Sequence, residues 1–316
     1  MPRNKVQFQK GLSEDGFDAL YGTEERCHAK LVSLRWPNGF ECPECGGQRH
    51  CIVKRGTRQL FQCNRCRKQT SVKAGTIFAS SKVCLRLWFK AIYHLTQSKN
   101  GISSIELGRR LGVTQTTAWI MKHKLAQVML ERNGAKLLKG VVQMDDAYLG
   151  GERPGKRGRG AAGKTPFVAA VAVTETGEPD RILLRRVAGF RKKAIGKLAR
   201  KALAPDAQVV SDGLACFAAV TEAGCTHTQV KTGGGAKAAK KPAFKWVNTT
   251  LGNIKSFLTG TYRAIREKHA PRYLAEFEYR HNRRYDLGAM IPRLAYVAVR
   301  TCPMPYALLK LADPCA

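Results

Sequence analysis

The chain has 316 residues with 55 Lys and Arg against 23 Asp and Glu, which gives a net charge of +32 and an isoelectric point near 10.1. Such an excess of positive charge indicates a polyanionic partner, whose binding should weaken steeply with salt. A membrane surface is the competing polyanion, but the sequence has no long uncharged apolar span, signal peptide or lipidation motif. With 44% hydrophobic residues, two or three folded domains are expected rather than global disorder.

Residues 1–34 carry helix-like signals, and we assign them no role beyond packing beside the next domain. The eleven cysteines are more informative, because four of them form the pairs CPEC (Cys42–Cys45) and CNRC (Cys63–Cys66), seventeen residues apart. In a chain without a secretion signal, this spacing indicates a structural Zn²⁺ site rather than a disulfide framework. Each pair follows a strand-like run, so we predict a zinc ribbon over residues 35–75.

Four thiolates complete a tetrahedral zinc shell: Cys42, Cys45, Cys63 and Cys66. The alternative is two chance pairs, and the residues that could substitute as ligands are His28, His50 and Cys51. The seven other cysteines show no comparable spacing, and we expect them to be reduced in a cytoplasmic protein associated with the nucleoid.

Residues 76–135 are predicted to be helical. The stretch from Val83 to Leu95 is an amphipathic helix with its apolar residues at core spacing. In the stretch that follows, Gly108, Gly112 and Ala118 are spaced as in a helix-turn-helix, where small residues let two helices touch and glycine makes the turn. A plain helical linker with a solvated basic face is the alternative. The second helix would present its first residues to a major groove, with these candidate DNA contacts: Gln115, Thr116 and Lys122.

After residue 138 the pattern becomes α/β. The expected elements are strands at 141–149, near 167–174 and at 181–187, a helix at 190–203, a strand at 207–211, a helix at 213–223, a strand at 226–231, and helices from about 246 and 269. This is the ribonuclease H-like order, in which the first and fourth strands are neighbours. We therefore place a ribonuclease H-like domain at 138–285 and regard the apolar tail, 286–316, as packing surface.

Four polar residues of this domain stand where a site would form. Asp145 and Asp212 each end an apolar strand-like run, and the predicted topology brings them to one sheet edge. Asn248 and Lys255 follow seven residues apart, on one face of a helix. Carboxylate and amide oxygens suit Mg²⁺, and two such ions drive in-line displacement at a phosphodiester. Turn residues, a helix N-cap at Asn248 and an exposed helix lysine are the structural alternatives.

The chain resembles the ISXO-like insertion-sequence transposases, which join a zinc ribbon to a ribonuclease H-like transposase domain. The resemblance rests on MDDAYLGG (144–151), GRGAAGKTP (158–166), VSDG (210–213), VNTTLGNIK (247–255), GTY (260–262) and YRHNRR (279–284). It implies Mg²⁺ or Mn²⁺ as catalytic cofactor and the following catalytic set: Asp145, Asp212, Asn248 and Lys255. The first three would hold the metal.

The sequence departs from the family pattern in two places. The first motif is often Asp-Glu and is Asp145-Asp146 here. Because side chains alternate along a strand, we expect only one of these to line the site and choose Asp145. The third ligand, Asn248, is an amide, which lowers the negative charge on the metals. Three rivals are expected to face elsewhere or to be solvated or paired: Asn253, Glu276 and Glu278.

A basic loop, residues 153–164, follows Asp145 and is either a solvated hairpin or a phosphate-contacting segment. Its candidate DNA contacts are Lys156, Arg157, Arg159 and Lys164. The resemblance implies an enzyme that binds the terminal inverted repeats and target sites of double-stranded DNA as a homo-oligomer, cleaves strands and transfers them. The alternatives are a non-catalytic DNA-binding regulator and a structure-specific nuclease of the same fold.

Overall fold

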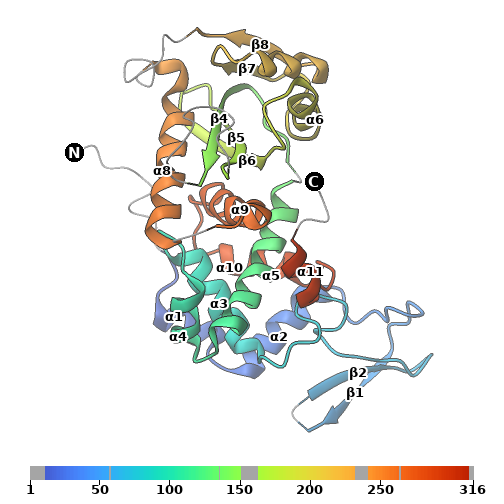
Figure 1. Ribbon diagram of the computed structural model, residues 1–316. Helices are drawn as coiled ribbons and strands as arrows, with labels where there is room; N and C mark the ends of the chain where they lie inside the picture. The colour runs from blue at the N-terminus through green and yellow to red at the C-terminus, as the bar shows by residue number, and fades with distance from the viewer. Residues whose placement is uncertain are drawn as a thin grey trace. The chain divides into compact units, whose positions relative to one another are not determined.

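The computed structural model describes residues 11–56, 58–134, 136–150, 163–231, 241–262 and 265–312 (Figure 1). They divide into two compact units. The N-terminal unit contains the described residues up to Val128 together with Tyr285–Leu311, and the sheet unit contains Met129–Arg284 and Ala312. Within these described ranges, no helix is long and apolar enough to cross a membrane.

The N-terminal unit is mostly helical. Its helices are α1 (Glu14–Tyr21), α2 (Glu24–Arg35), α3 (Leu85–Gln97), α4 (Ser104–Leu111), the larger part of α5 (Gln115–Asn133), α10 (Met290–Ala298) and α11 (Tyr306–Leu311). The predicted apolar stripe of α3 is confirmed, because Trp88, Phe89 and Ile92 are fully buried. The chain after residue 286 adds the buried Ile291 and Leu294 of α10 to the unit, in agreement with its expected packing role.

Helices α4 and α5 meet through small residues at the predicted positions. Gly112 ends α4 with a left-handed φ of 65°, a conformation that glycine adopts without strain. A Cβ on Gly108 would lie 3.0 Å from the Val113 carbonyl oxygen and 3.6 Å from the Ala118 Cβ. The two helices therefore cross so closely that a larger residue at 108 would push them apart, whereas DNA binding by this pair stays a prediction.

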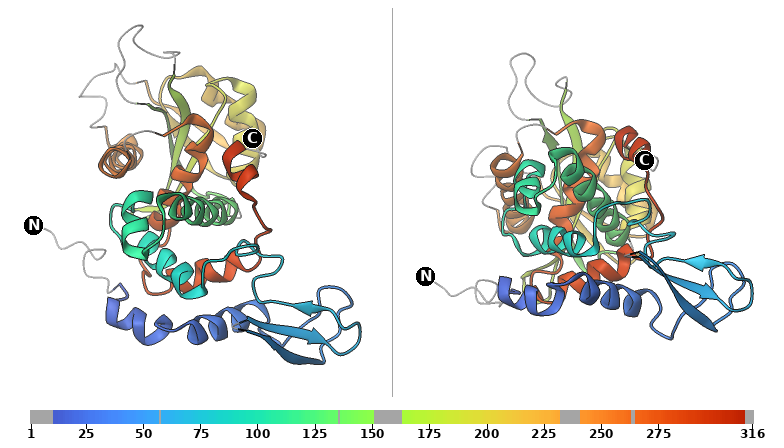
Figure 2. Two further views of the ribbon diagram at one scale, coloured as in Figure 1. Left: turned by 60° about the horizontal axis from the view of Figure 1, so that its bottom comes forward. Right: turned by 90° about the horizontal axis from the view of Figure 1, so that it is seen from below.

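The predicted ribbon is a three-stranded antiparallel sheet in the order β1 (His50–Arg55), β2 (Arg58–Cys63) and β3 (Gln69–Thr70). Figure 2 shows its hairpin beside the end of α2. Its core is small. Phe40 and Phe61 stack with ring centroids 5.5 Å apart, and Trp36 packs edge-on against both. So few apolar side chains give little stabilisation without a metal.

The sheet unit is mixed α/β with five strands in the order β6-β5-β4-β7-β8. The strands are β4 (Val141–Leu149), β5 (Thr165–Val173), β6 (Pro179–Arg186), β7 (Gln208–Ser211) and β8 (Thr226–Gln229). The first three are antiparallel neighbours, β7 pairs parallel with β4, and β8 pairs parallel with β7. The predicted adjacency of the first and fourth strands is confirmed, since Met144 pairs with Ser211.

Helices cover both faces of this sheet, as Figure 1 shows for α6 and α8. On one face α6 (Lys192–Ala202) and the 3₁₀ helix η2 (Ala215–Ala223) pack on Val142, Met144 and Val209. The segment expected as an α-helix at 213–223 is thus a 3₁₀ helix. On the other face lie the short turn η3 (Pro242–Phe244), α8 (Lys245–Thr261), η4 (Glu267–His269) and α9 (Ala270–His281).

Helix α9 covers the edge strand β6 with polar side chains. The Glu278 carboxylate accepts the Leu184 N–H at 3.0 Å and the Arg185 guanidinium at 2.6 Å. One turn later, Asn282 bonds both the N–H and the C=O of Ile182, at 2.8 and 2.9 Å. Backbone groups that would invite pairing with another strand are thereby satisfied.

Glu276 and Glu278 were expected to be solvated or paired, and only the pairing is right. They are 0% and 1% exposed. Glu276 accepts the Tyr262 hydroxyl at 3.1 Å, and burial raises the pKa of Glu278 although Arg185 opposes this. Solvation was expected from residue type alone. In the structure, Glu276 and Glu278 lie on the side of α9 that faces Tyr262 and β6.

Acidification is expected to destabilise the sheet unit through His281. Burial, helped by Arg284, lowers the pKa of this imidazole to about 3 from 6.5. The unfolded chain therefore binds one more proton between these two values, so the stability is present above about pH 6.5 and is lost as pH falls towards 3. The free energy of unfolding is measured with urea at pH 7.5, 6.0 and 5.0. As the pH falls, it should decrease by about 1 kcal/mol per pH unit less in His281→Gln than in wild type. Identical slopes of unfolding free energy against pH in the two proteins would show that His281 does not cause this loss of stability.

Candidate functional site

Two acidic residues converge where β4 and β7 run side by side. Asp145 follows Met144 in the middle of β4, not at the end of a strand as was expected, whereas Asp212 directly follows Ser211, the last residue of β7. Because Met144 and Ser211 are partners in a parallel ladder, the next residue of each strand lies at the same edge. Carboxylate oxygens of Asp145, Asp212 and also Asp146 lie within 4.8 Å of one another. The structure therefore brings together the two aspartates that the strand order predicted to meet.

Asp146 is the member of this cluster that sequence reasoning excluded, and the exclusion is wrong. Strand alternation fixes where each Cβ points, but a carboxylate oxygen lies two bonds further along a rotatable chain. Asp145 Oδ1 accepts the N–H of Asp146 at 2.8 Å, so its carboxylate folds along the backbone towards its neighbour. Two adjacent acidic residues within a strand were the signal that could have kept both residues in the site.

The carboxylate of Asp212 is oriented by its own turn. Its Oδ1 accepts the Leu214 N–H at 3.0 Å, as in an Asx turn. The second carboxylate oxygen is not used in this turn bond, so a turn role and a ligand role are compatible. Asp145, Asp146 and Asp212 are all half-buried, which restricts their motion and leaves them within reach of solvent.

Asn248 lies inside helix α8 rather than at its cap. The helix begins at Lys245, so the alternative that Asn248 is the N-cap is wrong. The helix-start N–H groups of Trp246 and Val247 instead donate to Gln143 Oε1, at 2.9 and 3.1 Å. Gln143 precedes Asp145 by two residues on β4. Sequence reasoning missed this glutamine, because the contact joins residues about a hundred positions apart.

Lys255 is exposed on α8, two turns after Asn248 and about 10 Å further along the helix axis. Both residues flank the buried stripe that faces the sheet, which includes Val247, Leu251 and Ile254. The rival Asn253 is exposed. Helix α8 thus places the Asn248 amide near its start and the Lys255 ammonium group on the same side of the helix, two turns later.

Three carboxylates this close repel one another unless a cation or protons offset their charge. Their hard oxygen atoms are the ligands that Mg²⁺ and Mn²⁺ prefer. The donor set of Asp145, Asp146 and Asp212 therefore fits a divalent cation.

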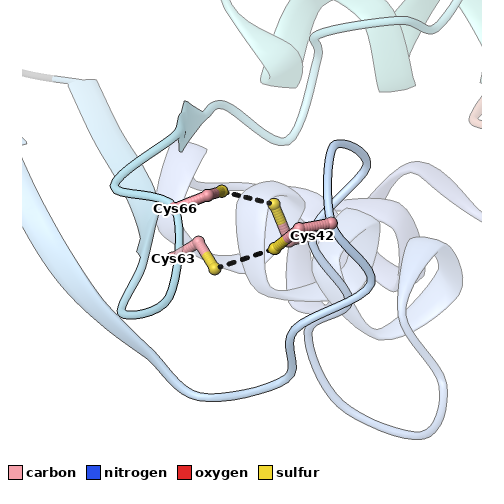
Figure 3. A group of neighbouring side chains, drawn as sticks. Cys42, Cys63 and Cys66 are labelled. Carbon is pink, nitrogen blue, oxygen red and sulfur yellow. Dashed lines mark hydrogen bonds between the residues drawn. The ribbon is translucent and has the colours of Figure 1, made fainter.

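The second candidate metal site is the cysteine cluster of the ribbon (Figure 3). Four sulfur atoms lie within 4.8 Å of one another: Cys42, Cys45, Cys63 and Cys66. The Sγ–Sγ distances are 3.6 Å for both Cys42–Cys66 and Cys45–Cys63. Tetrahedral Zn²⁺ with Zn–S bonds of about 2.3 Å requires about 3.8 Å, so the cluster fits zinc.

Backbone N–H groups also point at these sulfurs. Those of Cys66 and Arg65, together with the neighbouring thiols, lower the pKa of Cys63, while the same thiol contacts raise the pKa of Cys66, so Cys63 is the sulfur of this pair that loses its proton first. A thiol that loses its proton readily is suited to bind a metal. Among the described residues, His28, His50 and Cys51 are not part of the cluster.

The predicted DNA contacts fall into three groups. Gln115 and Thr116 are exposed at the start of α5, as a base-reading role requires. Lys122 is only 2% exposed and its Nζ donates to the Ile102 carbonyl at 2.6 Å, so it supports the fold and we drop it as a DNA contact. In the basic loop, Lys164 is half-buried just before β5. Three further candidates lie outside the described residues: Lys156, Arg157 and Arg159.

Two domain models match the chain, and the matched ranges include the carboxylate cluster and the cysteine cluster. Residues 137–282 match the ISXO2-like transposase domain, and residues 22–69 match the transposase zinc-ribbon domain. The chain thus contains an ISXO2-like transposase domain and a transposase zinc-ribbon domain. A protein in transposable element ISH50 of Halobacterium salinarum is 28% identical over 140 residues, which are 43% of this chain. The match spans 45% of that relative's length.

Proposed function

We propose that this ISXO-like protein is an insertion-sequence transposase that binds the ends of its element and catalyses metal-dependent strand cleavage and strand transfer. The observation that carries the proposal is the carboxylate cluster formed by Asp145 and Asp146 of β4 and by Asp212, which directly follows the parallel neighbour strand β7. The strand order and the transposase-domain match support a ribonuclease H-like fold. The net charge of +32 supports a nucleic-acid substrate.

Each residue of the site has a proposed task. Asp145 and Asp212, with Asp146 beside them, hold divalent cations, and Asn248 completes one coordination shell. Bound Mg²⁺ or Mn²⁺ supplies Lewis-acid stabilisation of the attacking and leaving oxygens during in-line displacement. Lys255 contacts a phosphate near the scissile bond. Water and later a freed 3′-hydroxyl attack the phosphorus directly, so no covalent bond to the enzyme is required.

The N-terminal unit contributes recognition in this proposal. Gln115 and Thr116 contact base edges, and the ribbon is held by zinc. The basic loop, residues 153–164, belongs to the sheet unit and contacts phosphates. Transposases generally act as paired protomers on paired ends, so we expect a homo-oligomer on DNA, by analogy with the family.

Gln115→Ala is expected to reduce the preference for element-end DNA over shuffled DNA by about 1–3 kcal/mol, because a base-reading amide is lost. The matched Lys122→Met should lower the melting temperature and leave that preference unchanged, since Lys122 is buried against the Ile102 carbonyl. Fluorescence anisotropy with both DNAs at one salt concentration measures the difference. An equal loss by Gln115→Ala on both DNAs would contradict base reading.

The deciding experiment incubates the purified protein with Mg²⁺ or Mn²⁺ and DNA that carries the ends flanking its own gene. Metal-dependent cleavage at the ends, followed by joining to a target, is the expected result. Specific binding without cleavage under either metal would favour the non-catalytic regulator. Cleavage of branched DNA without joining would favour the structure-specific nuclease.

A further inference from the structure

We infer that Gln143 is a positioning residue that holds Asn248 in place for the metal site at Asp145. The inference rests on the proposed function, because it assigns a task within that site. Gln143 is 6% exposed in the middle of β4, between Val171 of β5 and Val210 of β7 in register. A buried amide side chain at the centre of a sheet needs partners, and those of its oxygen lie on α8.

The contact is a helix cap supplied by a distant strand. The first N–H groups of a helix have no partner within the helix, and the N-cap residue of α8, Phe244, has no side chain that accepts a hydrogen bond. Gln143 Oε1 accepts two of these groups, from Trp246 at 2.9 Å and from Val247 at 3.1 Å. One oxygen therefore fixes the start of α8 onto β4.

Further contacts hold the same turn. The indole Nε1 of Trp246 donates to the Gly177 carbonyl at 2.7 Å, in the turn between β5 and β6. Val247 is fully buried in the core between α8 and the sheet. The helix start thus has a hydrogen-bonded attachment to β4, a second one to the β5–β6 turn and an apolar anchor in the core. Of the two polar attachments, only the first is made by the strand that carries Asp145.

Asn248 and Asp145 share this attachment. Asn248 directly follows Val247, whose N–H Gln143 holds, and Asp145 lies two residues, about 7 Å, beyond Gln143 on the same side of β4. Loss of the Gln143 oxygen would free the start of α8 and shift Asn248 relative to the carboxylates. Groups that orient a metal ligand without touching the metal typically alter affinity 10–100-fold.

The test compares Gln143→Met, which has similar volume but no acceptor, with Gln143→Glu, which keeps one. Mn²⁺ binding is measured without DNA by electron paramagnetic resonance of the free ion, and end cleavage is measured separately. Gln143→Met is expected to weaken Mn²⁺ binding about 10-fold. Gln143→Glu keeps an oxygen that accepts the Trp246 and Val247 N–H groups and should stay within about threefold of wild type. Gln208→Met, at an exposed position of β7, is the matched control and should bind Mn²⁺ normally.

The route through Asn248 is tested by a double-mutant cycle. If Gln143 acts by positioning Asn248, adding Gln143→Met to Asn248→Ala should weaken Mn²⁺ binding no further. Additive losses, or normal Mn²⁺ binding by Gln143→Met, would overturn the inference. Should Gln143→Met fail to fold, Gln143→Asn withdraws the oxygen by about one C–C bond and is expected to show the same weakened binding. Wild type that binds no Mn²⁺ and cleaves no DNA would overturn the proposed function as well, whereas an active wild type with an unaffected Gln143→Met overturns this inference alone.

Discussion

Asp145→Asn and Asp212→Asn should each reduce end cleavage by on the order of a thousandfold while specific DNA binding is retained. Each substitution removes a negative charge from the cluster and keeps the size of the side chain. Because Asp145 is held within β4 and Asp212 directly follows β7, neither can move to replace the other. The measurement is single-turnover cleavage of end DNA in Mg²⁺ and Mn²⁺, with binding followed by anisotropy on the same preparations.

Asp146→Asn and a matched control sharpen this result. Asp146 lies within the same 4.8 Å cluster, and we expect its loss to cost about tenfold, with a higher metal concentration needed for half-maximal cleavage. Asp180→Asn, at an exposed position of β6, should behave as wild type. Cleavage at the wild-type rate by Asp145→Asn or Asp212→Asn would contradict the assigned site, even if the protein is a transposase.

The convergence of Asp145 and Asp212 was predictable because it follows from topology. The apolar runs fixed the strands to within a residue or two, and their order placed the first strand beside the fourth. Both aspartates then had to reach one edge whatever the details of their side chains. The cysteine pairs were predictable for a similar reason, because two short knuckles leave few ways to arrange four sulfurs.

The wrong prediction for Asp146 came from the use of a periodicity rule. Such rules place the Cβ atom of a residue but not the end of its side chain. Alternation correctly placed the Cβ atoms of Asp145 and Asp146 but did not determine where their oxygens lie. Lys122 follows Ala118 by four residues on the buried side of α5, so helical spacing already argued against exposure. The contact between Gln143 and α8 was beyond reach, because no local pattern relates residues so far apart in the chain.

Zinc removal is expected to unfold the ribbon while the sheet unit stays folded. The apolar core of the ribbon consists of little more than Trp36, Phe40 and Phe61. Binding of a structural zinc contributes about 10–16 kcal/mol in zinc-finger peptides, more than so small a core supplies. Chelation, or Cys63→Ser, should therefore abolish hydrogen-exchange protection across residues 40–70 and leave the peptides of β4 and β5 protected.

Cys51→Ser provides the control for this experiment. Cys51 is exposed on β1, next in sequence to His50, and lies outside the sulfur cluster. Its variant should keep one zinc per chain by elemental analysis and full protection of the ribbon. A Cys63→Ser protein that kept both its zinc and the hydrogen-exchange protection of its ribbon would contradict the four-thiolate site. Arg35 ties the end of α2 to the residues that directly follow β3, through the Ser71 and Val72 carbonyls at 2.9 and 2.7 Å. These bonds start from a helix that packs independently of the metal, so α1–α3 should retain their protection and confine the loss to the ribbon.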